Sequence, residues 1–293
     1  MEARKPSAPQ FYPADCGRAA ERLLQGFRPP PEPARVVAGI VPHAGWQYSG
    51  AVAAKVFASV RAKASPTTFV IFGAVHRWAG INGVYARGAW ATPLGPVPID
   101  EALAARILEV TSEWTVDEPK AHSGEHSIEV ELPFVKYLFP DARVVPIAVN
   151  PDSRAVPLGR RIGEIVKGLA ETVVLIGSSD LSHYGDVYGF TPAGYGPRAH
   201  RWMQDNDARI LRLVEEMKAA EIPAEAHRHH NACGAGAMAA TVAAAEVLGV
   251  RHGFLLEYTT SHDVFPEAEF HMAVGYAGVI FGGAWGGAGE GVA

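Results

Sequence analysis

The chain has 293 residues, 48% of them hydrophobic and 19% charged, with a formal net charge of −5, a composition typical of a globular protein with a sizeable core. Because the chain has no block of Lys or Arg, nucleic acid and anionic membranes are poor candidates as partners. The sequence has no apolar N-terminal stretch and no run of about 18 apolar residues, so we expect no signal peptide and no membrane span. Cys16 and Cys233 are the only cysteines, so we expect no disulfide framework and a cytoplasmic protein.

Runs rich in β-branched residues alternate with segments of helical spacing along the whole chain. Strands are predicted over residues 35–43, 67–76, 142–150, 172–180, 252–261 and 271–281. Helices are predicted over 49–63, 100–112, 126–139, 153–170, 197–220 and 233–249, and the proline-rich segment 88–100 predicts an irregular hairpin off the sheet centre. This alternation is typical of an α/β fold with a largely parallel central sheet flanked by helices. We expect one domain over residues 1–293, with its core at about 10–281 and flexible tails at both ends.

Polar residues follow several of the predicted strands at equivalent positions. His43 ends the first strand, His76 ends the second, and Asp180 and His183 follow the "VLIGSS" strand. A single histidine at a strand end is usually a hydrogen-bonded loop residue. However, the carboxyl ends of parallel strands meet at one edge of a sheet, where open α/β sheets bind their ligands. Imidazole is also the commonest metal ligand, so this arrangement favours a site.

The segment "HSGEHSIEVELPF" adds Glu125, His126 and Glu129 at the expected start of a helix, which Ser123 can cap. In one interpretation, Glu125 only stabilises the positive end of that helix. In the other, the His126 ring faces whatever lies above the sheet. The residues alone leave both interpretations open.

Cys233 precedes a helix rich in glycine and alanine, and thiols at helix N-termini have lowered pKa values. This position suits a metal ligand or a nucleophile, although a small buried residue at close helix packing would look the same. Cys233 with His183 and Asp180 could imitate a cysteine hydrolase, but no nucleophile elbow accompanies them. Paired spacings of a structural zinc site are also missing. His227, His229 and His230 are expected to form an exposed loop cluster.

Six motifs together resemble the Memo family, known in prokaryotes as protein B of the AmmeMemoRadiSam system. They are "FYPAD", "VPHAGWQYSG", "GAVHRWAG" with "GAWATPLGPVPID", "EHSIEVELPF", "SSDLSHYG" and "ACGAG", in that order from about Gln10 to Phe281. Memo proteins are structurally similar to class III extradiol dioxygenases, which are non-haem Fe(II) enzymes that open catechol-like rings. The resemblance therefore implies this fold and a metal site for the present chain.

The resemblance also implies roles for individual residues. His43, His76 and Cys233 would be the metal ligands, with Cys233 at the position of a carboxylate in the dioxygenases. His183 would be the acid/base that handles a substrate hydroxyl proton, Asp180 would orient or bind, and His126 would face the substrate. We assign further substrate contacts to the following residues: Trp46, Tyr48 and Glu125. Trp46 stands where Tyr is common in the family, and both it and Tyr48 could instead be core residues.

The function implied is that of a mononuclear non-haem iron oxidoreductase, dioxygenase-like, acting on a phenolic or aromatic small molecule or side chain. Fe(II) is the expected metal, with Cu or Zn as alternatives because a thiolate is a soft ligand. The alternative is a non-catalytic adaptor that binds a metal or peptide in the same pocket. The name of the AmmeMemoRadiSam system implies that genes for AMMECR-like and radical-SAM proteins accompany those of the family, so these proteins are candidate partners.

Overall fold

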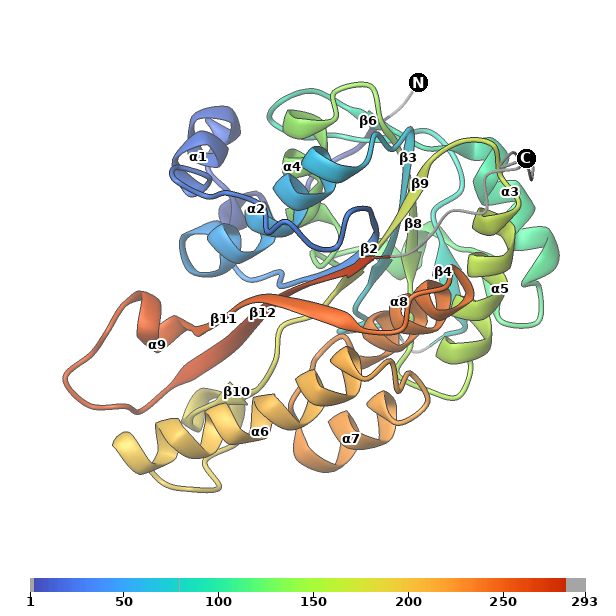
Figure 1. Cartoon of the computed structure of the whole chain (residues 1–293). Coiled ribbons are helices and arrows are strands. Elements are labelled where there is room, and N and C mark those ends of the chain that lie inside the picture. The colour runs from blue at the N-terminus through green and yellow to red at the C-terminus, as the bar shows by residue number, and fades with distance from the viewer. Residues whose placement is uncertain (1–2, 79, 283–293) are drawn as a thin grey trace, which may run out of the picture.

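A computed structural model of the protein describes residues 3–78 and 80–282, and most of its strands form one large sheet between layers of helices (Figure 1). The strands are β1 (Ala3–Arg4), β2 (Val36–Val41), β3 (Thr68–Gly73), β4 (Asn82–Val84), β5 (Ala89–Trp90), β6 (Val97–Pro98), β7 (Thr115–Asp117), β8 (Arg143–Ala148), β9 (Val173–Ser178), β10 (His183–Tyr184), β11 (Gly253–Thr260) and β12 (Ala273–Gly282).

The α-helices are α1 (Cys16–Leu23), α2 (Trp46–Lys63), α3 (Glu101–Val110), α4 (Leu132–Leu138), α5 (Ala155–Lys167), α6 (Pro197–Glu215), α7 (Ile222–His229), α8 (Ala235–Val247) and α9 (Ser261–Val264). Short 3₁₀ turns are η1 (Pro9–Phe11), η2 (Pro119–His122), η3 (Glu129–Glu131) and η4 (Asp186–Tyr188). Within the described ranges, none of the helices has the length and apolar character needed to cross a bilayer.

The large sheet has the strand order β10-β12-β2-β9-β3-β8-β4-β7, and β11 pairs with β12. Its centre, β2-β9-β3-β8, is parallel throughout, whereas β12 and β11 extend one side in antiparallel pairing. In the parallel register Val41 lies beside Ser178, and Gly73 lies beside Ala148. The carboxyl ends of β2, β9 and β3 therefore meet at one edge of the sheet, which confirms the predicted α/β architecture.

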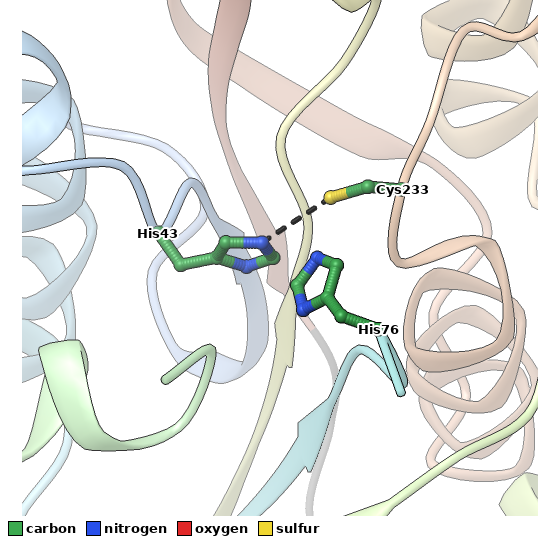
Figure 2. A group of neighbouring side chains, drawn as sticks. All are labelled: His43, His76 and Cys233. Atoms are coloured by element: carbon green, nitrogen blue, oxygen red, sulfur yellow. Dashed lines mark hydrogen bonds between the residues drawn. The ribbon is translucent and has the colours of Figure 1, made fainter. Parts of the chain in front are cut away.

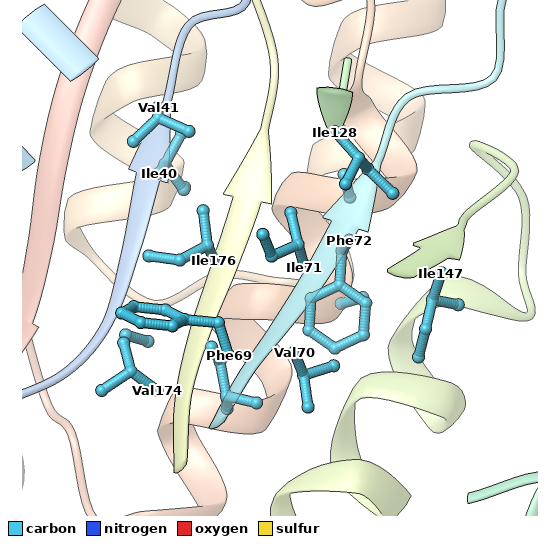
Figure 3. Close-up of a cluster of buried hydrophobic side chains, with 14 of the residues drawn as sticks. Ile40, Val41, Phe69, Val70, Ile71, Phe72, Ile128, Ile147, Val174 and Ile176 are labelled. Atoms are coloured by element: carbon cyan, nitrogen blue, oxygen red, sulfur yellow. The ribbon is translucent and has the colours of Figure 1, made fainter. Parts of the chain in front are cut away.

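The central strands are mainly apolar because helices cover both of their faces. Every residue of β2, β3 and β9 is buried. Figure 3 shows side chains of these strands and of β8 packed together, with Ile128 joining them from the segment before η3. On one face lie α2 and α4, and on the other lie α8 and α5 (Figure 1). This two-sided burial makes the sheet a rigid support for the loops at its edge.

Two expectations need correction. No helix begins near Ser123, because Ser123 ends η2 and the Glu125 carboxylate binds the backbone N–H groups of His126 and Ser127; α4 starts only at Leu132. The N-terminal tail is also not free within the described residues, since Ala3–Arg4 pairs with β5.

The segment 88–100 forms the expected hairpin, with β5 and β6 antiparallel in a separate small sheet. The predicted C-terminal tail, residues 283–293, lies outside the described residues.

Candidate metal centre

His43, His76 and Cys233 come together at the carboxyl edge of the central sheet (Figure 2). One ligand atom from each of the three lies within 4.8 Å of the others. His43 follows β2 by two residues and His76 follows β3 by three, so the parallel register places them as neighbours. Cys233 approaches from the loop between α7 and α8, and its Sγ lies 3.2 Å from His43 Nε2. Two imidazoles and a thiol thus converge from segments far apart in the sequence.

The tautomer of His43 follows from its hydrogen bonds. Ser178 Oγ lies 2.8 Å from His43 Nδ1 and donates its own proton to the Ser127 carbonyl at 2.6 Å. Because a hydroxyl has one proton to donate, Ser178 accepts from Nδ1–H, and Nε2 is left as the unprotonated atom facing Cys233. Burial, reinforced by the neighbouring His126 and His76, lowers the pKa of His43 well below its usual value. His43 is therefore a neutral imidazole, the form that ligates metals.

His76 is oriented by the Glu125 carboxylate. Glu125 Oε2 accepts from the His76 ring Nδ1 at 3.0 Å and from its backbone N–H at 3.1 Å. Burial alone would favour the neutral ring, but the hydrogen bond and charge of Glu125 raise the pKa of His76. In return, although burial opposes its ionisation, His76 and backbone N–H groups hold the pKa of Glu125 well below its usual range. A carboxylate on one imidazole nitrogen leaves the other free to ligate, as in carboxylate–histidine metal sites.

Cys233 is held against the end of β9. Its backbone N–H donates to the Asp180 carbonyl at 3.2 Å, and the next residue, Gly234, permits the close approach. A Cβ at Gly234 would lie 2.3 Å from the Ser178 carbonyl oxygen, so this position requires glycine. The expected lowering of the thiol pKa is wrong. Burial and the negative charge of Asp180 raise the pKa of Cys233, and α8 begins only two residues later.

His126 lies beside the cluster, and Phe11 lies against His126. The centroid of the His126 ring lies 5.0 Å from that of His76 and 5.3 Å from that of His43. Phe11, in η1, lies against the other side of the His126 ring at 4.6 Å. Burial, with the charge of His76, lowers the pKa of His126. The ring is therefore a neutral polar group between the cluster and the adjoining cavity.

Asp180 and His183 belong to the loop that follows β9. Asp180 Oδ1 accepts the His43 backbone N–H at 2.7 Å, and burial raises the pKa of this carboxyl to about 7. His183 Nδ1 donates to the Leu181 carbonyl at 3.0 Å, which leaves Nε2 as an acceptor. Burial lowers the pKa of His183, so its Nε2 is unprotonated near neutral pH. Asp180 thus positions the His43 loop, and His183 offers a base.

A cavity of about 410 Å³ adjoins the cluster and is lined by His126, Asp180 and His183. Tyr48, at the start of α2, lines it as well. The rest of the wall comes mainly from η4 and from the β11–β12 connection: Tyr188, Ser261, His262, Phe265, Glu267, Met272, Val274 and Tyr276. The cavity is mostly aromatic and has imidazole nitrogens at the end nearest the cluster.

Two predicted substrate contacts lie elsewhere. Trp46 is buried in the core, where it stacks on Phe134 at 3.8 Å and donates from Nε1 to the Val130 carbonyl. The stacking contact and the hydrogen bond hold the ring in the core rather than in the wall of this cavity. Glu125 is also buried, and its oxygens are occupied by His76, His126 and Ser127. It orients a ligand of the cluster and is not among the residues that line the cavity. His227 and His229 lie on α7 and take no part in the cluster.

Sequence reasoning gave no role to Ser178 or Phe11, and it named Glu129 without foreseeing its contacts. Ser178 could have been found from its place at the end of a buried strand, two residues before Asp180. Glu129 accepts hydrogen bonds from Ser7 N, Ala8 N and Tyr12 Oη and pairs with Arg4 at 2.7 Å. This tie holds the N-terminal segment that carries Phe11, and no local signal links residues so far apart.

Comparison with known proteins gives a consistent family assignment. The family described as Memo-like protein matches residues 4–280. A MEMO1 family protein of Pyrococcus abyssi is 35% identical over 285 residues, which cover 93% of this chain and 97% of that protein. One of Thermococcus kodakarensis is 34% identical, covering 94% and 97%, and one of Methanosarcina acetivorans is 33% identical, covering 96% and 99%.

A solved structure supports the fold. An uncharacterized protein of Escherichia coli K12 superposes with a TM-score of 0.51, covering 85% of this chain and all of that one. At 14% identity this likeness concerns the fold alone. The family match and the curated relatives carry the assignment further and confirm the resemblance seen in the motifs. The chain belongs to the Memo-like family.

Proposed function

We propose that the protein is a mononuclear non-haem iron oxidoreductase, dioxygenase-like, that acts on a phenolic or otherwise aromatic small molecule or side chain. The observation that carries the proposal is the convergence of His43, His76 and Cys233 beside an aromatic cavity that also contains the base His183. A set of metal ligands with no adjoining cavity would suit a structural ion. A cluster beside a cavity with its own base suits chemistry on a bound molecule.

The residues present fit a metal ion. Ser178 occupies Nδ1 of His43, and Glu125 occupies Nδ1 of His76, so Nε2 of each ring is available. Cys233 adds a thiol that becomes a thiolate ligand when its proton is lost. Three protein ligands would leave coordination positions for substrate and dioxygen, and Fe(II) bound there would pass electrons from the aromatic ring, which is oxidised, to dioxygen, which is reduced. Cu or Zn would also suit the thiolate.

The protein's own groups account for binding and proton transfer. His183 Nε2 is an unprotonated acceptor at the cavity wall and would take the proton of a phenolic hydroxyl. His126 faces the same cavity and would hydrogen-bond the bound ring substituents. The less exposed aromatic side chains of the lining, Phe11 and Tyr276, would hold a flat ring and exclude water. The groups that would bind the substrate, orient it and accept its proton thus line one cavity beside the cluster.

Metal analysis tests the ligand set. Protein purified without oxygen and loaded with Fe(II) should hold one ion per chain, whereas His43→Ala and Cys233→Ala should lose most of it. His227→Ala, on exposed α7, and Cys16→Ala, the only other cysteine, are matched controls that should retain the metal. Unchanged iron content in both ligand variants would overturn the assignment.

Oxygen uptake tests turnover separately. Screening catechols and tyrosine-containing peptides should find uptake that requires both Fe(II) and His183, with His183→Ala retaining the metal and losing the uptake. Metal binding without uptake on any of these compounds would instead support the non-catalytic adaptor that binds metal or peptide in the same pocket.

A further inference from the structure

The permanent charges of the side chains that line the cavity are all negative. Among the described residues that line it, Asp180 and Glu267 are carboxylates, and none is Lys or Arg. Asp180 is buried and engaged by the His43 backbone. Glu267 is exposed, in the connection between α9 and β12, and makes no hydrogen bond or ion pair with any other described residue. The cavity therefore has one free negative charge at its mouth and no permanent positive charge.

Aromatic side chains surround the same mouth. Tyr48 and Phe265 meet edge to face with ring centroids 5.3 Å apart, and their side chains are 36% and 53% exposed. Tyr188, 44% exposed, adds a third ring to the lining. Ring faces attract ammonium groups, and a nearby carboxylate strengthens that attraction. Rings that are exposed at a cavity mouth beside a free carboxylate are suited to recognising a cation.

We infer that the substrate carries an ammonium group, which Glu267 and the rings of Tyr48, Tyr188 and Phe265 hold at the cavity mouth. The inference rests on the proposed function, since the phenolic end of the same molecule would lie near His126 and His183. An ammonium placed at the mouth gains a carboxylate partner. A carboxylate or phosphate at the same place would face Glu267 without a Lys or Arg to balance it. The cavity therefore selects amine-bearing phenols over acidic ones.

Binding of three catechols that differ in one side chain tests the inference. The metal-loaded protein, kept without oxygen, is titrated calorimetrically with an aminoethyl catechol, an ethyl catechol and a carboxyethyl catechol. The aminoethyl compound should bind about fivefold more tightly than the ethyl compound, the size of effect expected of one exposed ion pair with ring contacts. The carboxyethyl compound should bind most weakly. Higher salt should reduce the difference.

Variants assign the selectivity to Glu267. Glu267→Gln should bring the aminoethyl and ethyl affinities close together, and Glu267→Lys should reverse the order in favour of the carboxyethyl compound. Glu269→Gln, two residues away and outside the cavity lining, should keep the wild-type order. A preference for the ammonium that survives in Glu267→Gln overturns the role of Glu267. Equal affinities for all three compounds, or binding of none of them, overturn the inference, whereas the proposed function is tested separately by metal content and oxygen uptake.

Discussion

Glu125 and His76 hold each other through two hydrogen bonds, one to the ring and one to the backbone of the histidine. The second carboxylate oxygen accepts the N–H groups of His126 and Ser127. A single buried carboxylate therefore fixes both the loop after β3 and the segment before η3. It orients the His76 ring directly and positions the backbone of His126 beside it.

Replacing Glu125 should weaken metal binding without removing a ligand. Glu125→Gln keeps the size of the side chain but removes the charge that supports the His76 ring, so metal affinity should fall about tenfold or more. Anaerobic competition with a chelator measures this directly. Glu109→Gln, on the exposed side of α3, is the control and should bind as the wild type does. Wild-type affinity in Glu125→Gln would contradict the orienting role.

Removing the Ser178 hydroxyl should affect both stability and metal affinity. Ser178→Ala leaves His43 Nδ1–H and the Ser127 carbonyl without a partner in a buried place, at a cost of about 1–3 kcal/mol in the free energy of unfolding. The His43 ring also loses the acceptor that keeps its proton on Nδ1, so metal affinity should fall. Ser59→Ala, at a buried position in α2, should lower stability less and leave metal affinity unchanged. Equal effects of the two variants on metal affinity would refute this role.

Breaking the Arg4–Glu129 ion pair should destabilise the protein strongly, because the side chains are only 10% and 1% exposed. Arg4→Met leaves a buried carboxylate without its cation and should cost about 3 kcal/mol, measured by chemical denaturation. Glu129→Gln in the same chain removes that charge, so the double variant should lose less than the sum of the two single losses. Strict additivity would show that the pair contributes nothing beyond its separate side chains.

Stability should depend on pH through Asp207, whose oxygens accept from Ser182 N at 2.9 Å and Tyr258 Oη at 2.8 Å. Burial raises the pKa of Asp207 from 3.8 to about 6, so the folded state binds the proton more tightly than the unfolded chain. This contribution to stability is complete below about pH 4 and is lost as the pH rises through 6.

The comparison with Asp207→Asn isolates this effect, because the amide does not titrate. Relative to the variant, the wild type should lose on the order of 3 kcal/mol in its free energy of unfolding between pH 4 and pH 7. A difference that stays constant across this range would assign the pH dependence to other groups.

Much of the fold and the cluster could be predicted because both depend on periodic signals. Apolar runs identified the buried strands, and parallel pairing then implied that His43, His76 and Asp180 would share one edge. Cys233 joined them through the family motif, since nothing in its local sequence indicates which sheet edge its loop approaches. The metal role of this set stays a prediction.

The errors arose where a tertiary contact overrides a local pattern. Ser123 looks like a helix cap, but Glu125 binds the N–H groups nearby and delays the helix to Leu132. Trp46 belongs to the same motif as His43, yet its ring is buried in the core, where it stacks on Phe134. The N-terminal tie to Glu129 joins residues about 120 positions apart, a distance at which no sequence period operates.

The long sequence separations at the centre also order its assembly during synthesis. Phe11 is made early, but the segment that carries it can dock only after Glu129 has left the ribosome. Cys233, 190 residues after His43, arrives when most of the sheet has been made. A nascent chain would therefore present the two histidines long before the thiol, and the three side chains could meet only after residue 233 has left the ribosome.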